Sequence, residues 1–224
     1  MEETGRRNPN AGADRVGLAN CATLHWNWTE SALLEEAVRR GEGVLTRAGA
    51  FSVETGKHTG RSVLDKFIVE DPRNADDIWW DNNRPMARAS FDQLKADMIA
   101  FADEKVLFAN DLYGGRHPDH RISVRVFTEY AWHSLFIRHL LVRPDLSEIE
   151  GFVPQFTVID IPSFKADPER HGCRSETVIA CDLENGLILI GGTSYAGEMK
   201  KSVFSILNHL LPQADILPMH CSAN

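Results

Sequence analysis

Residues 187–201 read Leu187-Ile188-Leu189-Ile190-Gly191-Gly192-Thr193-Ser194-Tyr195-Ala196-Gly197-Glu198-Met199-Lys200-Lys201. The first four residues are apolar and suit a buried strand, and the glycine pair that follows suits a turn. Beyond the turn, apolar residues recur with the period of a helix, which predicts a helix over 197–211. Its apolar stripe comprises Met199, Val203, Ile206, Leu207 and Leu210. A strand that leads through a turn into a helix is a building unit of α/β proteins.

Three further helices are predicted ahead of this segment. One spans 29–40 and is capped by Thr29, one starts at Ser90 in a capping box with Gln93, and one spans about 129–141. The spacing in the third turns Trp132, Leu135, Phe136 and Leu140 inward. Strands are predicted over 48–54, 66–69, 105–109, 122–127, 153–161, 176–182 and 187–190, the last two joined as a hairpin through Asn185-Gly186. This order predicts an α/β fold with a mixed β-sheet and flanking helices.

Composition sets the broad class of the protein. The 224 residues suit one domain, of which 1–20, rich in Gly, Asn, Arg and Ala, are expected to form a flexible N-terminal arm ahead of a domain over 21–224. A formal net charge of -8 argues against a nucleic-acid binder. No apolar stretch approaches the roughly 20 residues that span a bilayer, and no secretory signal is present at the start. Four cysteines without CxxC spacing suit reduced thiols, so we expect a cytoplasmic protein without membrane or nucleic-acid partners.

The segment Thr55-Gly56-Lys57-His58-Thr59-Gly60-Arg61-Ser62 is the first candidate site. Its glycines allow backbone N–H groups to approach an anion, and Arg61 offers a planar fork for a carboxylate. From the residues alone, a surface turn with a solvated arginine is the simpler interpretation.

Tyr195, Lys200 and Lys201 form the second candidate site, at the start of the 197–211 helix. Periodicity places Lys201 nearly opposite the apolar stripe, which favours a solvated lysine, whereas the adjacent glycine turn and positive helix end favour an anionic ligand. His220 is either a core histidine or a metal ligand, since imidazole is a common ligand. His133 and His139 are assigned to structure.

Three motifs together resemble the ATP-dependent phosphoenolpyruvate carboxykinases. They are the 55–62 segment, the Tyr-x-Gly-Glu-Met-Lys-Lys run from Tyr195, and Met-His-Cys-Ser-Ala-Asn from Met219; segments 79–85, 125–136 and 162–168 extend the resemblance over nearly the whole chain from about residue 15. Family members usually carry Pro-Lys where this chain has Val63-Leu64, which removes a positive charge near Arg61.

The resemblance implies the N-terminal, substrate-binding domain of such an enzyme. In the family, residues that match Arg61, Tyr195 and Lys201 bind the substrate, and those that match Lys201 and His220 bind Mn²⁺ and reach the nucleotide site. Lysine ligates a metal only when neutral, so its pKa has to be lowered by desolvation and by neighbouring positive charge. The third protein ligand and the P-loop belong to a C-terminal domain, and the 224 residues contain no Gly-x-x-x-x-Gly-Lys-Ser/Thr.

The implied reaction is that of gluconeogenesis, in which oxaloacetate and ATP give phosphoenolpyruvate, ADP and CO₂, with Mn²⁺ and with Mg²⁺ carried by ATP. Without the nucleotide-binding half, we expect this chain to be inactive and largely metal-free. The alternative is a stand-alone, non-catalytic domain that binds a small anion or a protein partner.

Overall fold

The computed structural model describes residues 1–221 and contains a nine-stranded mixed sheet. Neighbouring strands run antiparallel in the pairs β7–β8 and β10–β11 and parallel in the others. The strands lie in the order β1 (Glu2–Gly5), β2 (Thr23–Trp26), β7 (Val106–Gly114), β8 (Ile122–Thr128), β9 (Phe156–Ile161), β11 (Leu187–Gly191), β10 (Val178–Asp182), β5 (Lys66–Val69) and β6 (Arg84–Met86). A small hairpin of β3 (Val44–Leu45) and β4 (Phe51–Ser52) lies outside this sheet. The α/β fold with a mixed sheet is therefore confirmed.

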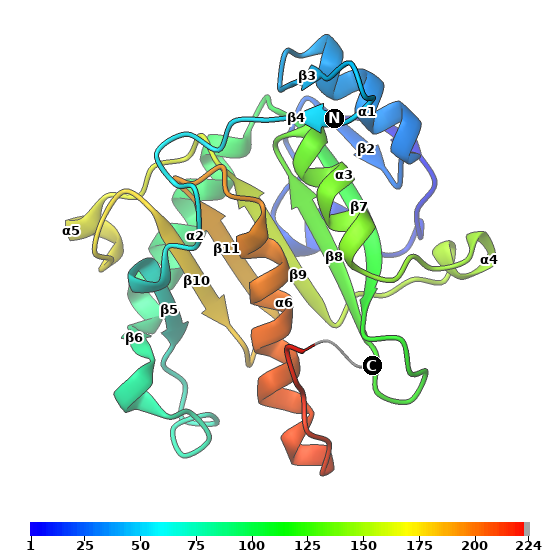
Figure 1. The fold of residues 1–224 in the computed structure, drawn as a ribbon. Helices are drawn as coiled ribbons and strands as arrows, with labels where there is room; N and C mark the ends of the chain where they lie inside the picture. Colours follow the sequence, from blue (N-terminus) through cyan, green and yellow to red (C-terminus); the bar gives the residue numbers. More distant parts are fainter. Residues whose placement is uncertain (222–224) are drawn as a thin grey trace.

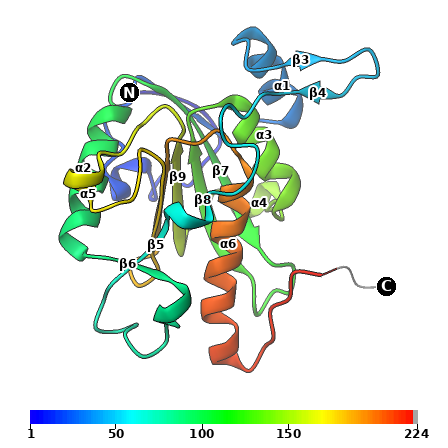
Figure 2. The same ribbon diagram turned by 60° about the vertical axis from the view of Figure 1, so that its left-hand side comes forward.

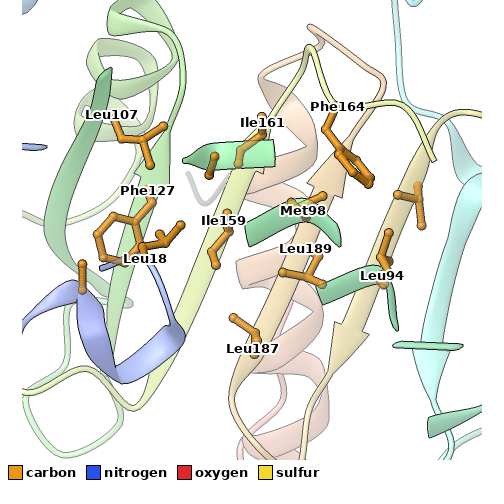
Figure 3. Close-up of a cluster of buried hydrophobic side chains, with 14 of the residues drawn as sticks. Leu18, Leu94, Met98, Leu107, Phe127, Ile159, Ile161, Phe164, Leu187 and Leu189 are labelled. Atoms are coloured by element: carbon orange, nitrogen blue, oxygen red, sulfur yellow. The ribbon is translucent and has the colours of Figure 1, made fainter. Parts of the chain in front are cut away.

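Helices cover both faces of the sheet (Figure 1). The apolar side chains of α2 (Arg88–Ala102) belong to one buried cluster, and those of α1 (Glu30–Arg39), α3 (Ala131–Leu140) and α6 (Gly197–Leu210) belong to a second. Figure 3 shows part of the first cluster, where Leu94 and Met98 of α2 meet Ile159 and Leu189 of the sheet. Because both faces are covered, strands β9, β10 and β11 are buried along their whole length. Two one-turn helices, α4 (Leu146–Ile149) and α5 (Pro168–His171), lie in connections.

Several local predictions match the structure closely. Thr29 caps α1, accepting a hydrogen bond from the backbone N–H of Ala32 at 3.3 Å. Helix α6 and strand β5 begin at the predicted residues, and β10 and β11 form the predicted hairpin, with Gly186 at φ 67°. None of the helices in residues 1–221 combines the length and apolar character that crossing a bilayer requires.

The predicted capping box at Ser90 is wrong. Helix α2 begins at Arg88, two residues earlier, and its N-cap residue Ala87 makes no side-chain capping bond. The chain leaves β6 at Met86 and turns directly into the helix, which places Ser90 inside the first turn. The Gln93 side chain instead donates to Asp97 one turn further on, at 2.9 Å.

The inward face of α3 also differs from the prediction. Leu140 is 43% exposed, whereas the polar residues His133 and Ser134 are buried. Both polar side chains have partners: Asp160 on β9 for His133, and the Asn110 side chain on β7, which donates to the Ser134 hydroxyl at 2.6 Å. A buried polar residue with a hydrogen-bond partner costs little, so apolar spacing alone misses this face.

The N-terminal 20 residues fold against the sheet. Strand β1 pairs with β2, and Ala11, Ala13 and Leu18 are at most 2% exposed. The buried guanidinium of Arg125 donates to the carbonyl of Ala11 and holds this segment to β8. This packing differs from the flexible arm that the composition predicts.

The end of β10 that is remote from the candidate site is held by an ion pair. Arg88 of α2 donates two hydrogen bonds to the Asp182 carboxylate. Burial raises the pKa of Asp182, but the hydrogen bonds from Arg88 and Asn185 lower it by more, so the net shift is downward.

Candidate active site

The site lies where β11 ends and α6 begins. The connection turns at Gly192, whose φ of 71° suits glycine and whose Cβ would stand 2.2 Å from the carbonyl oxygen of Glu176. Helix α6 then starts without a side-chain cap, and its N-terminal end, where the dipole is positive, directly follows Tyr195.

The 55–62 segment is docked onto this helix end. The backbone N–H of Ser62 donates to the Glu198 carboxylate at 2.6 Å, and Figure 2 shows the segment between β4 and β5 passing the N-terminal end of α6. Glu198 is only 2% exposed, and its burial raises its pKa, while the Ser62 N–H and the charges of Arg61 and Lys66 act in the opposite direction. The buried carboxylate of Glu198 therefore joins the 55–62 segment, which carries Arg61, to helix α6, which carries Lys200 and Lys201.

His58 ties the same segment, through Thr177, to the start of β10 and to the turn at Gly192. The Thr177 hydroxyl donates to the carbonyl of Gly192 at 2.9 Å, so it has to accept from His58 Nε2, which lies 2.9 Å away. His58 Nδ1 then faces the Ser62 hydroxyl at 2.9 Å and accepts from it when the ring is neutral. This series of hydrogen bonds fixes the tautomer of His58 and the path of the backbone before Arg61.

The docked segment brings Arg61 near enough to Lys201 for their charges to interact. Arg61 is exposed, whereas Lys200 and Lys201 are half-buried. Loss of solvent around Lys201 lowers its pKa, and the charges of Arg61 and Lys200 lower it further. The family resemblance implies desolvation and neighbouring positive charge at this lysine; the contribution of Arg61 is seen only in the structure. The three cations form a local positive site on a chain whose net charge is -8.

Tyr195 lies against the first residue of the helix. A Cβ on Gly197 would stand 2.5 Å from Cε1 of the Tyr195 ring, so only glycine lets the ring rest on the backbone. The ring also borders an open, mainly apolar cavity of about 430 Å³, whose other walls include Phe51, Val53, Trp132, Leu135, Phe136 and His139. Trp132, Leu135 and Phe136 therefore line a cavity in addition to packing on the core.

Lys201 and His220 meet at one aromatic ring. Lys201 Nζ lies 5.5 Å from the ring centroid of Phe204, and the His220 ring centroid lies 5.6 Å from the same ring. Both residues line a cavity of about 260 Å³, although His220 is largely exposed. Residues 222–224, which complete the Met219 motif, lie outside the described part of the chain.

These two side chains fit a metal ion only in part. They offer two nitrogen donors, and within residues 1–221 no group of three His, Cys, Asp or Glu side chains could hold a metal ion. Manganese prefers oxygen ligands, so a carboxylate from elsewhere is needed to complete such a site.

Comparison with known proteins agrees with the motifs in this site. The model of the phosphoenolpyruvate carboxykinase family matches residues 22–224. The chain belongs to this family. Relatives named phosphoenolpyruvate carboxykinase (ATP) are 56% identical in Sinorhizobium medicae, 58% in Rhizobium leguminosarum bv. trifolii and 57% in Chelativorans sp.. All 224 residues are matched, and the chain spans 42% of the length of these carboxykinases.

Sequence reasoning missed the residues that hold the carboxykinase motifs together. Glu198 lies inside a quoted motif, but its hydrogen bond to Ser62 crosses 136 residues of sequence and leaves no local signal. His58 and Thr177 are linked in the same way across 119 residues. The departure at Val63-Leu64 falls on exposed side chains, 61% and 53% accessible, directly after Ser62. The bond from Ser62 to Glu198 is present with these two residues in place.

Proposed function

We propose that this chain supplies the oxaloacetate-binding part of an ATP-dependent phosphoenolpyruvate carboxykinase. The observation that carries the proposal is the bond from the Ser62 N–H to Glu198, which brings the charge of Arg61 near Lys201 of α6. Membership of the carboxykinase family supports the same assignment. We place the protein in the cytoplasm, where its nucleotide and dicarboxylate substrates would be found.

Arg61 is proposed to bind a carboxylate of oxaloacetate. Arg61 is exposed at the end of a segment that two hydrogen bonds tie to Thr177 and Glu198 and a third stabilises internally, so the side chain is accessible while its backbone is fixed. Two parallel N–H donors match the two oxygens of a carboxylate. Tyr195, resting on Gly197, is proposed to contact the same substrate and limit its orientation.

Decarboxylation breaks the bond between the methylene carbon and its carboxylate, releases CO₂ and leaves the electron pair on the enolate of pyruvate. The enolate oxygen then attacks the γ-phosphorus of ATP, and the bond to the departing ADP oxygen breaks. Arg61, Lys200 and Lys201 supply positive charge where this negative charge develops. The segment docked against α6 keeps these groups preorganised.

A metal ion in this site would be held by Lys201 and His220 together with a carboxylate from outside residues 1–221. When bound, Mn²⁺ would act as a Lewis acid toward the enolate oxygen, and Mg²⁺ would accompany ATP. The lowered pKa of Lys201 favours the neutral amine that ligation needs. The same two residues are proposed to face the nucleotide phosphates.

The test uses a chimera in which these 224 residues replace the matching segment of the Rhizobium leguminosarum relative. We expect the chimera to form phosphoenolpyruvate from oxaloacetate and ATP. Arg61→Lys should cost about 2–4 kcal/mol of transition-state stabilisation in kcat/KM, since an ammonium cannot reproduce the paired contact. Arg84→Lys is the matched control, because Arg84 is exposed on the edge strand β6.

The outcome also separates the enzyme from a non-catalytic anion-binding domain. A folded chimera that binds oxaloacetate without converting it would favour the binding domain. Equal kcat/KM in Arg61→Lys and Arg84→Lys would show that Arg61 does not hold the substrate.

A further inference from the structure

His133 occupies a fully buried position that the proposed chemistry leaves unused. Its ring is 0% exposed and lies between two acceptor groups. Nδ1 is 2.5 Å from the Asp160 carboxylate on β9, and Nε2 is 3.0 Å from the carbonyl oxygen of Ser194. Ser194 directly precedes Tyr195, so this histidine connects α3 to the candidate site.

The protons of this arrangement can be counted. A carbonyl oxygen carries no proton, so Nε2 must donate to Ser194. A second proton lies between Nδ1 and Asp160, giving either an imidazolium with a carboxylate or a neutral imidazole with a carboxylic acid. In both forms the pair is neutral overall, as its burial requires, and in both Nε2 remains a donor.

The charges around the pair agree with this count. Burial raises the pKa of Asp160, His133 lowers it, and Glu129 raises it. Glu129 is itself paired with Lys105 at 3.0 Å. Glu198 of α6 also lies near Asp160, and the Glu42 carboxylate accepts from the backbone N–H of Trp132, the residue before His133, at 2.9 Å. The Trp132 and Tyr130 rings pack edge-on against the imidazole. No solvent reaches the ring to replace the Ser194 bond.

The hydrogen bond from His133 to the Ser194 carbonyl is one of few that tie the 192–196 segment to the rest of the molecule. Residues 192–196 belong to neither β11 nor α6, so no strand or helix ladder fixes the orientation of their peptide groups. Gly192, at the start of this segment, is held by the Thr177 hydroxyl, and the Tyr195 N–H makes a local bond to the Thr193 hydroxyl at 3.1 Å. Asp160 pairs in register with Ile190 of β11. His133 bonds to Asp160 on one side and to the Ser194 carbonyl on the other, so it links the position of Ser194 to that of the sheet.

We propose that His133 is a positioning residue, which orients Tyr195 by donating from Nε2 to the Ser194 carbonyl while Asp160 holds its other nitrogen. The inference rests on the proposed role of Tyr195 in oxaloacetate binding. A purely structural histidine would contribute to stability alone.

Two substitutions separate these roles. The side-chain amide introduced by His133→Gln reaches toward the former Nε2 position and can donate to Ser194, whereas the shorter amide of His133→Asn reaches only toward Asp160. Both remove the imidazole and its packing. In the chimera, His133→Asn should raise KM for oxaloacetate about tenfold or more, since a small displacement of a positioning group is amplified in catalysis. His133→Gln should restore KM to within a few-fold of the unmodified value.

Nuclear magnetic resonance of the 224-residue chain supplies a readout that does not depend on turnover. The unmodified chain should show a slowly exchanging Nε2–H signal from His133, and a Nδ1–H signal shifted far downfield when that proton resides on the ring. The Tyr195 ring signals should move in His133→Asn and stay in place in His133→Gln. An inactive unmodified chimera would count against the proposed function, while these spectra would still decide the role of His133.

Equal KM values in the two variants, together with unmoved Tyr195 signals, would overturn the inference. So would a His133 ring without an Nε2–H signal, which tests the proton count even where a variant fails to fold.

Discussion

Replacing Gly197 by alanine is expected to displace the Tyr195 ring and leave the fold intact. The added Cβ would stand 2.5 Å from Cε1, 2.9 Å from Cζ and 3.1 Å from the phenol oxygen. Carbon atoms settle at roughly 3.5–4 Å, so the ring has to retreat by about 1 Å. It has room to do so, because it borders the cavity of about 430 Å³ beside Trp132.

The effects on stability and on binding should differ. Gly197 does not have a positive φ, and alanine in a helix is favoured over glycine by about 0.5–1 kcal/mol. That gain offsets the cost of moving a half-buried ring, so the free energy of unfolding should change by less than about 1 kcal/mol. A 1 Å displacement of a positioning group can cost about 10²-fold in catalysis, so kcat/KM of the chimera for oxaloacetate should fall by up to this factor.

Urea denaturation of the 224-residue chain, resonances of the Tyr195 ring and kcat/KM of the chimera give the three measurements. Gly151→Ala is the control, because a Cβ there meets only the Glu148 carbonyl oxygen, at 3.9 Å. Unchanged ring signals with unchanged kcat/KM would show that the ring does not depend on this glycine. A large loss of stability would show that the ring has no room to move.

Three further outcomes are expected. Asp182→Asn should lower the free energy of unfolding by about 1–3 kcal/mol at neutral pH, because its arginine partner loses a charged acceptor. The pKa of Asp182 is lowered in the folded state, so this stabilisation is present above the unfolded-state pKa of about 3.9 and is lost as the pH falls through the folded-state pKa. If the difference in unfolding free energy between the variant and the unmodified chain stayed constant in acid, the ion pair would be contradicted. In the chimera, His220→Ala and Lys201→Ala should each weaken Mn²⁺ binding by about tenfold or more, and binding should weaken in acid as both ligands protonate; affinity unchanged by both substitutions would place the metal elsewhere. The isolated chain should bind Mn²⁺ weakly and convert no oxaloacetate, because its 224 residues contain no P-loop motif; ATP-dependent turnover by the purified chain would refute this.

Short-range patterns by themselves determined much of the fold. The cap at Thr29, the period of α6 and the Asn185-Gly186 turn are set by neighbours a few residues apart, so the sequence predicts these elements closely. The motifs around Arg61, Tyr195, Lys201 and His220 also identified the candidate site, since each is a continuous run of residues.

Only the tertiary structure decided the order of the strands, the packing of residues 1–20 and the buried face of α3. Short strands such as β1, β2 and β6 carry too little alternation to be recognised, and they exist because a neighbouring strand completes their hydrogen bonds. The bonds from Ser62 to Glu198 and from His133 to Ser194 join residues 136 and 61 positions apart. Each bond stabilises a polar group that would be costly to bury without a hydrogen-bond partner. The partner comes from a distant part of the sequence and is brought into place by the fold, so no local sequence pattern indicates it.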